Sequence, residues 1–160
     1  RLSGEERLAS IPLPEAVRSE RAKWRGPMAL GRDGRLYGAP GHSDKVLVVD
    51  PRRRTASCLP LPEVEGVYGL GEGGHFKWNG IAAGHEGRRL FCSPQNMDFV
   101  LELEIPEAEA LEEAPRLRLI RIPEPVVGLV YKWAGIALGP DGRRLYCAPL
   151  NSAAVLEIDP

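Results

Sequence analysis

The sequence predicts an all-β protein built from repeated four-stranded antiparallel sheets, and three observations support this prediction. First, a segment of about 54 residues occurs three times in the chain of 160 residues. Second, each copy divides into short apolar runs separated by turn residues, which is the pattern of antiparallel strands. Third, the chain contains 18 Gly and 15 Pro, which forces frequent turns and excludes a bundle of long helices.

Each copy of the repeat opens on a Lys-Trp pair. The pairs are Lys23-Trp24, Lys77-Trp78 and Lys132-Trp133, so successive copies start 54 and 55 positions apart. In every copy a Gly-Arg run that continues into Leu and an aromatic residue leads to a Pro, and this Pro stands 17 positions after the Lys. A Val-Leu run then closes the copy. This agreement in phase indicates one structural unit that is repeated three times.

The third copy shows how the strands are expected to be divided. Its first three strands are predicted over Gly135–Gly139, Arg143–Ala148 and Ala153–Ile158, with a hairpin turn that ends at Asp141-Gly142. A fourth run precedes each Lys-Trp pair, and these runs are Arg7–Pro12, Thr55–Leu61 and Leu117–Ile122. Two insertions, Glu63–Phe76 and Pro106–Pro115, are expected on loops. Four strands in about 54 residues is the size of one blade of a β-propeller.

The repeats resemble β-propeller blades of the NHL, YVTN and regucalcin-like kind. The resemblance rests on the Lys-Trp-x-Gly start, the Gly-Arg-x-Leu-Tyr-x-x-Pro run and the Val-Leu-x-x-Asp-Pro run, and it covers the chain from about Arg7 to Pro160. It implies that the strand after each Lys-Trp pair lines a central channel and that the other strands lie outside it. Since propellers close with 4–8 blades and three are present, we expect an incomplete ring or half-propeller.

The chain is predicted to form a single β-propeller repeat domain over residues 1–160. The blades are expected at about 23–61, 77–122 and 132–160, and an outer strand equivalent to 7–12 would complete the third. The chain thus opens on an outer strand and closes after a third strand, so its two ends are complementary. We expect protein partners at these ends, either a second copy or subunits of a larger assembly.

All three Trp and three of the four Lys lie in the Lys-Trp pairs. In the interpretation we favour, each indole fills the seam between neighbouring blades, and each Lys either extends its ammonium group to solvent or pairs with a carboxylate such as Asp50 or Asp159. The alternative is a ring of ammonium groups for an anionic ligand.

Asn96 and Asn151 follow equivalent Pro residues and suit turns, where a ligand could also reach them. The candidate binding residues are Lys23, Trp24, Lys77, Trp78, Lys132, Trp133, Asn96 and Asn151.

Composition and motifs exclude several classes of function. The formal net charge of −1 creates no long-range attraction for nucleic acid, and no apolar stretch is long enough to span a membrane. The three Cys lack the C-x-x-C spacing of a zinc site. The expected inner strands carry no carboxylate or amide, unlike the channel of regucalcin-like lactonases, whose metal is held by Glu, Asn and Asp side chains. We therefore expect no metal, cofactor or catalytic set.

These observations favour a non-catalytic protein-interaction scaffold, an accessory subunit of a larger complex. The chain begins at Arg1 rather than Met, which we interpret as a processed or partial chain, and processing would fit an organellar protein. Two alternatives stay open: a lactonase-like or other hydrolase whose site forms in a completed ring, and a glycan-binding lectin whose Trp residues stack on sugars. Shielded indoles would favour the scaffold, and exposed indoles would favour the lectin.

Overall fold

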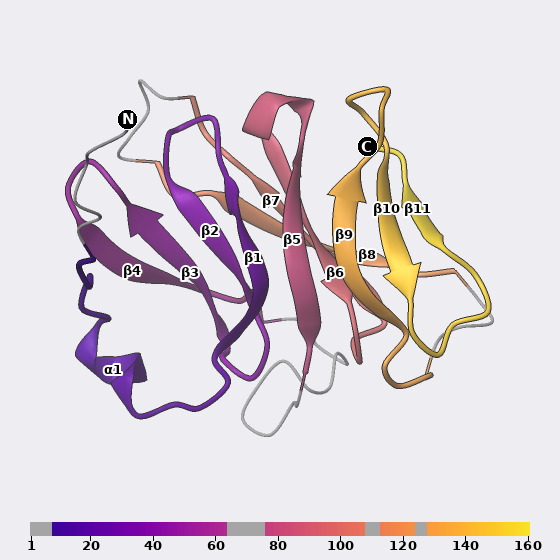
Figure 1. The fold of residues 1–160 in the computed structure, drawn as a ribbon, viewed down its shortest axis with the longest axis horizontal. Coiled ribbons are helices and arrows are strands. Elements are labelled where there is room, and N and C mark those ends of the chain that lie inside the picture. The colour runs from indigo at the N-terminus through magenta and orange to yellow at the C-terminus, as the bar shows by residue number, and fades with distance from the viewer. Residues whose placement is uncertain (1–7, 64–75, 108–112, 124–127) are drawn as a thin grey trace, which may run out of the picture.

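Three antiparallel sheets stand side by side in the computed structural model, which describes residues 8–63, 76–107, 113–123 and 128–160 (Figure 1). Blade 1 consists of β1 (Trp24–Leu30), β2 (Leu36–Pro40), β3 (Lys45–Asp50) and β4 (Thr55–Pro60). Blade 2 consists of β5 (Trp78–Gly84), β6 (Arg89–Pro94), β7 (Phe99–Glu104) and β8 (Arg116–Arg121), with the 3₁₀ turn η1 (His85–Gly87) after β5. Blade 3 consists of β9 (Trp133–Leu138), β10 (Leu145–Pro149) and β11 (Leu156–Ile158).

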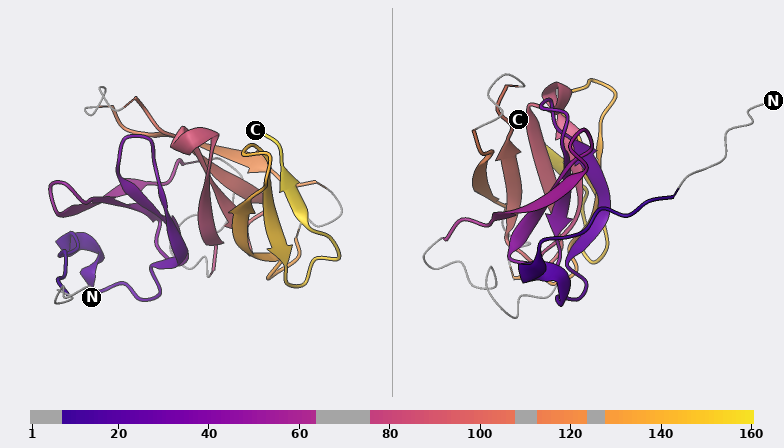
Figure 2. Two further views of the ribbon diagram at one scale, coloured as in Figure 1. Left: turned by 45° about the horizontal axis from the view of Figure 1, so that its top comes forward. Right: turned by 90° about the vertical axis from the view of Figure 1, so that its left-hand side faces the viewer.

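Within each sheet, strands that follow one another in the chain are hydrogen-bonded neighbours. The strands that begin with Trp, β1, β5 and β9, form the inner edge of the three sheets and contact one another in that order (Figure 1). Turned by 45°, the sheets separate into a purple group, a group that runs from rose to orange, and a gold group (Figure 2). Repeated antiparallel sheets with their first strands side by side are the arrangement of propeller blades. The predicted all-β class is confirmed.

The hairpin turns form where the sequence predicts them, because Gly supplies the backbone conformation that they need. Gly34, Gly87 and Gly142 have φ angles of 78°, 80° and 66°, in the left-handed region that other residues rarely adopt. In the third blade, Asp141 Oδ1 accepts hydrogen bonds of 3.0 Å from the backbone N–H groups of Arg143 and Arg144. These Asx contacts fix the turn between β9 and β10.

The core lies in two seams between neighbouring blades. Seam 1–2 contains buried apolar side chains of blades 1 and 2, among them Tyr37, Val46, Trp78, Leu90 and Leu101. Seam 2–3 contains those of blades 2 and 3, among them Phe91, Val100, Trp133, Leu145 and Leu156. Because successive side chains alternate across a strand, each blade has a front face toward the preceding blade and a back face toward the next. Leu90 therefore belongs to the front face of blade 2, and Phe91 belongs to its back face.

The backbones of the inner strands approach one another closely at one glycine in each blade. A Cβ atom added at Gly26 would lie 2.6 Å from the Cα atom of Gly80, and one added at Gly80 would lie 3.3 Å from the Cα atom of Gly135. All three glycines have positive φ. The Gly of each Lys-Trp-x-Gly motif is therefore required both by the local backbone and by the neighbouring blade.

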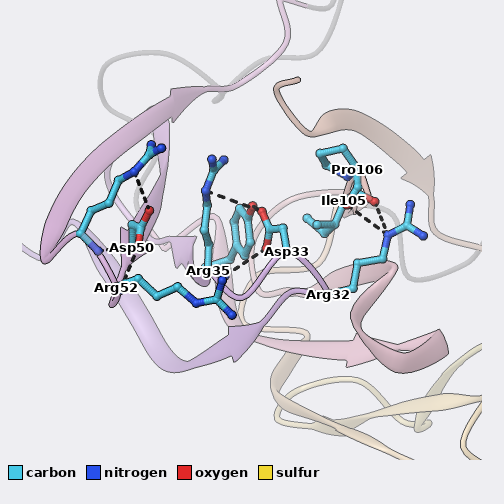
Figure 3. A network of polar contacts seen from close by, with 9 residues as sticks. Arg32, Asp33, Arg35, Asp50, Arg52, Ile105 and Pro106 are labelled. Atoms are coloured by element: carbon cyan, nitrogen blue, oxygen red, sulfur yellow. Dashed lines mark hydrogen bonds and ion pairs between the residues drawn. The ribbon is translucent and has the colours of Figure 1, made fainter. Parts of the chain in front are cut away.

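A polar network holds the end of seam 1–2 that lies away from the Lys-Trp pairs (Figure 3). Arg32, in the turn after β1, donates from Nε to the carbonyl oxygens of Ile105 and Pro106, at 2.8 and 3.2 Å. Its backbone N–H donates to Gly87 O at 3.0 Å. Nearby, the Tyr37 hydroxyl donates to Asp33 Oδ2 at 2.7 Å, and burial together with this bond raises the pKa of Tyr37. Blade 1 is thus pinned to blade 2 by contacts outside the repeated motif.

The N-terminal part of the chain completes no blade within the described chain. Residues 8–12 form no strand there, so the outer strand expected over 7–12 stays a prediction; Arg7 lies outside the described residues. An outer strand needs the unpaired edge of a third strand, whereas residues 8–12 lead into the short helix α1 (Glu15–Arg18) beside blade 1, far from β11 (Figure 1). Of the two expected loop insertions, residues 64–75 and 108–112 lie outside the described residues.

Candidate functional site

The eight candidate residues lie at one end of the three sheets, here called the Lys-Trp rim. The rim consists of Lys23, Lys77 and Lys132, the Trp that follows each of them, and the equivalent loop residues 41–44, 95–98 and 150–153, which follow the second strand of each blade. Strand pairing places Trp24, Trp78 and Trp133 opposite Pro40, Pro94 and Pro149. The constant spacing of Lys and Pro therefore reflects the register of the first hairpin in each blade.

The three indoles have the same hydrogen bond, made within their own blade. Nε1 of Trp24, Trp78 and Trp133 donates to the carbonyl oxygens of Lys45, Phe99 and Ala154 respectively, at 2.8 Å in each case. Trp78 and Trp133 are 0% and 2% exposed and belong to seams 1–2 and 2–3. Trp24, which has no blade in front of it, is half-buried. Burial against a preceding blade thus decides how far each indole is shielded.

Lys77 connects blade 2 to the preceding blade with both its backbone and its side chain. Its N–H donates to Gly41 O and its Nζ to His42 O, both at 2.9 Å. The side chain is 1% exposed, and this burial lowers the pKa of Lys77. The two carbonyls belong to loop 41–44 of blade 1. Lys77 therefore serves as a connection between blades.

Lys132 repeats this connection one blade further along. Its N–H donates to Gln95 O at 2.8 Å, and its Nζ lies 3.4 Å from Asn96 O and 3.0 Å from Asp98 Oδ1. The residue is fully buried. The expected carboxylate partners, Asp50 and Asp159, are wrong: Asp50 accepts from the backbone of Arg52 and Arg53, and Asp159 pairs with Arg143. These acids follow the third strand at the other end of the sheet, out of reach of the rim.

Lys23 stands at the same position of blade 1 and is half-buried. Its carbonyl oxygen accepts from Gly41 N and Ser43 N, at 2.8 and 3.2 Å, as that of Lys132 accepts from Leu150 N. Among the residues that the structure describes, its ammonium group makes no hydrogen bond or ion pair. Two of the three ammonium groups are therefore directed into loops of a preceding blade, and the described part of the chain offers no such loop to the third.

The two candidate asparagines tie the rim loops to the segments before the inner strands. Asn96 Oδ1 accepts from Tyr131 N at 2.6 Å, and Asn151 Nδ2 donates to Val130 O at 3.1 Å. The Asn96 bond crosses from blade 2 to blade 3, which the turn interpretation did not anticipate. Both contacts fix loop conformation, and both side chains stay at the surface of the rim.

Sequence reasoning missed the residue that precedes each Lys. Ala22, Phe76 and Tyr131 all have positive φ, between 47° and 54°, an uncommon conformation for residues other than Gly. Phe76 lies 6.0 Å from Tyr131 and 4.6 Å from the ring of His42, and the Arg25 guanidinium stacks 4.4 Å above it. The only sequence signal is an aromatic residue in the same column of two copies. The rim therefore carries an aromatic and cationic cluster outside the repeated motif.

Charged side chains also gather on the outer strands of blade 2, beside a pocket of about 600 Å³. Glu102 is 3% exposed and accepts from both Arg89 and Arg118, the latter at 2.7 Å. Its charge is thus compensated within the sheet.

In the described parts of the chain, no group of three or more His, Cys, Asp or Glu could hold a metal ion, and no helix is long and apolar enough to cross a membrane.

The back face of blade 3 exposes apolar side chains whose counterparts are buried. Val155 is 56% exposed, whereas Val46 and Val100 at the equivalent positions are 0% and 4% exposed. Two other apolar residues of blade 3 are exposed outside this face: Leu138, which pairs with Leu145 of the front face, and Leu150 of the rim loop are 43% and 52% exposed. A separate cavity of about 350 Å³ opens on the outer side of seam 2–3, lined by Phe91, Val100, Ile120, Ile122, Leu156 and Pro160 among others. Exposed apolar surface of this kind is typical of an interaction site.

Comparison with known proteins supports the fold but gives no family. No protein-family model and no curated protein matches the chain. Virginiamycin B lyase from Staphylococcus aureus, in selenomethionine form, matches with a TM-score of 0.56 at 10% identity, over 89% of this chain and 43% of that one. The β-propeller domain of Cps50 (Swd1) from Myceliophteria thermophila has a TM-score of 0.55 at 15% identity, with 82% and 38% covered.

A third solved structure is the periplasmic gluconolactonase PpgL of Pseudomonas aeruginosa, with a TM-score of 0.54 at 20% identity, over 83% of this chain and 38% of that one. The chain thus spans less than half the length of each of these three proteins. At such identities the likeness shows the fold alone. Three sheets of four, four and three strands with propeller neighbours confirm the predicted incomplete β-propeller.

Proposed function

We propose that the chain is a non-catalytic protein-interaction scaffold, an accessory subunit that docks other proteins on its open blade faces. The observation that carries this proposal is the contrast between the rim and the back face of blade 3. At the rim, Lys77 and Lys132 are buried and bonded to loops of the preceding blade, so their charge is not presented to a ligand. On the back face, Val155 exposes apolar surface at a position where Val46 and Val100 pack against the following blade.

The two other candidate functions receive less support. A lectin that stacks sugars on Trp needs accessible indoles, whereas Trp78 and Trp133 are 0% and 2% exposed. A hydrolase or lyase is suggested by the names of two structural neighbours, and a scaffold is compatible with the third. Since propellers host many activities, these names do not favour one class. The bonds of Lys77 and Lys132 inside the seams favour the scaffold, because they leave these side chains unable to bind a ligand.

The experiment that tests this proposal is photo-crosslinking in the cells that contain the protein. A photoreactive phenylalanine analogue at Val155 should give a covalent adduct with a discrete protein, because this side chain lies on the proposed docking face. The same analogue at Arg53, which is exposed in the turn after β3, is the matched control and should give none. Equal labelling at both positions, or no adduct at Val155, would contradict the scaffold.

A further inference from the structure

We propose that a second copy of this chain docks the front face of its blade 1 onto the back face of blade 3; this inference rests on the proposed scaffold function. The joint would repeat the two seams inside the chain. Both halves of such a joint are present among the described residues, at opposite ends of the three sheets (Figure 1). A chain that carries both halves can pair with itself head to tail.

The back face of blade 3 has the same residue pattern as the back faces that are buried in the two seams. Val155 corresponds to Val46 and Val100, and Tyr146 corresponds to Tyr37 and Phe91, both of which are 0% exposed. Tyr146 is half-buried and Val155 is 56% exposed. The difference is due to position, since nothing in the described chain lies against blade 3 as blade 3 lies against blade 2.

The front face of blade 1 is the complementary half. It presents four apolar side chains in the positions that blade 2 uses to fill seam 1–2. The positions in blade 1 are Trp24, Leu36, Leu47 and Val49, which are half-buried. Their counterparts in blade 2 are Trp78, Leu90, Leu101 and Leu103, which are all 0% exposed. Docking would complete the burial of a surface that is already apolar.

The inner strands leave room for the same close backbone approach. A Cβ atom at Gly26 or Gly80 would meet the glycine of the following blade at 2.6 or 3.3 Å. A Cβ atom at Gly135 would meet nothing within 4 Å. Gly26 of a second copy would occupy this vacant position if blade 1 took the place of a following blade.

Lys23 supplies the polar part of the joint. By the pattern of Lys77 and Lys132, its N–H and Nζ would donate to the carbonyl oxygens of Leu150 and Asn151, which correspond to Gly41 and His42 in blade 1. One element differs from the inner seams. The carboxylates of Asp44 and Asp98 have their counterpart in Ala153, so this joint would lack an ion pair and would be weaker than seam 2–3, where Asp98 contacts Lys132.

A second copy could also complete the sheet of blade 3. In the described chain, β11 has one free edge, whereas β3 and β7 are each paired with an outer strand. Residues 8–12 pair with no strand and Leu8 is 97% exposed. The sequence Pro12-Leu13-Pro14-Glu15, which begins at the last of these residues, repeats Pro60-Leu61-Pro62-Glu63, which begins at the last residue of the outer strand β4. Residues 8–12 of the second copy are therefore placed to pair with β11, next to the cavity of about 350 Å³.

Two copies joined in this way at both ends would form a ring of six blades, within the range in which propellers close. The test is the mass of the purified chain by light scattering and sedimentation across the micromolar range. The expected result is a concentration-dependent dimer of the 17.5 kDa chain. A monomer at every concentration, for wild type and for Ala153→Asp, would overturn the inference.

Matched variants separate the proposed joint from non-specific association. Gly135→Ala should abolish the dimer, because its methyl group blocks the approach of the second copy. Gly142→Ala has the same positive φ and the same open surroundings but lies in a hairpin turn, so it should dimerise like the wild type. Circular dichroism of the two variants should be identical. A dimer that survives Gly135→Ala would overturn the inference.

A double-mutant cycle tests the role of Lys23. Ala153→Asp restores the carboxylate of the inner seams and should tighten dimerisation about tenfold, equivalent to about 1.4 kcal/mol. In a Lys23→Met background the same substitution should have no effect. An equal gain in both backgrounds would contradict the contact. If the chain is monomeric and Val155 still crosslinks to a different protein in cells, the scaffold survives and the second-copy joint fails.

Discussion

Seam 1–2 and seam 2–3 share one end and differ at the other. At the Lys-Trp rim, both seams use a buried Lys that donates to a loop of the preceding blade. At the far end, seam 1–2 has the Arg32 bonds to Ile105 and Pro106, whereas the outer side of seam 2–3 holds a cavity of about 350 Å³. The contacts of the repeated Lys at the rim are thus common to both seams, whereas the Arg32 contacts at the far end occur in seam 1–2.

The same comparison separates two ways of compensating a buried ammonium group. In seam 2–3, Lys132 pairs with Asp98 at 3.0 Å. In seam 1–2, the equivalent Asp44 bonds Lys45, and burial lowers the pKa of Lys77 although the nearby charge of Asp44 opposes this shift. Because a buried charge is costly unless it is paired or hydrogen-bonded, each seam must supply its own acceptors. The carbonyl oxygens of the preceding loop are the part that both seams have in common.

The largest expected effect comes from removing an indole from an inner seam. Trp78→Ala deletes a fully buried ring from seam 1–2 and the hydrogen bond to Phe99 O, so the free energy of unfolding should fall by about 3–5 kcal/mol. Trp24→Ala is the matched control, since Trp24 makes the equivalent bond but is half-buried at the end of the array. Urea denaturation of the two variants measures the difference.

Equal destabilisation by the two Trp variants would contradict this account, because it would mean that the preceding blade contributes little to burial. The measurement should be made below the concentration at which the chain associates. Docking of a second copy would bury Trp24, so Trp24→Ala and Trp78→Ala would then lower the free energy of unfolding by similar amounts.

A smaller effect is expected from the inner-strand glycines. Gly26→Ala places a methyl group 2.6 Å from the Cα atom of Gly80 and should cost about 2–4 kcal/mol, from the positive φ and from the displacement of the neighbouring backbone. Gly135→Ala in the monomer meets nothing within 4 Å, so it should cost only the conformational part, about 1 kcal/mol. Thermal unfolding of the two variants checks the order, and the reverse order would show that the blades do not meet at these glycines.

Much of the fold follows from the sequence because each blade repeats the same local signals. The hairpin glycines, the register of Trp with Pro, and strands such as Thr55–Pro60 lie where the period places them. The outer strand over 7–12 stays a prediction, since a strand exists only where another edge accepts it and residues 8–12 pair with no strand in the described chain.

The site was less accessible to prediction than the fold. The Lys-Trp pairs marked the rim, but the acceptors of Lys77 are backbone carbonyls, which have no signature in the sequence. For the same reason the bonds from Arg32 to Ile105 and Pro106 could not be anticipated. Asp98 was within reach of prediction, because Asp44 occupies the same column of the repeat. Placing that column beside the next Lys requires the packing of blades, which one sequence does not contain.

The smallest expected effect is a pH dependence that distinguishes a thiol inside a seam from one outside. Burial in seam 2–3 raises the pKa of Cys147 to about 11, against 9.0 for an unperturbed thiol. Between these values the unfolded chain loses a proton that the folded chain keeps, so folding stability contributed by the neutral thiol is present below about pH 9 and is lost as pH rises toward 11. The slope should approach about 1.4 kcal/mol per pH unit.

The measurement is urea denaturation of wild type and Cys147→Ala over this range, in which the wild-type advantage should shrink as pH rises. Groups shared by both proteins that do not interact with Cys147, such as Tyr37, cancel in the difference. Cys58→Ala provides the contrast, since Cys58 lies on β4 outside both buried clusters and is only half-buried. Its pH profile should follow the wild type more closely because a partly hydrated thiolate loses less solvation. Parallel profiles for wild type and Cys147→Ala would mean that water reaches seam 2–3, as it would if the cavity beside β11 extended to the inner strands.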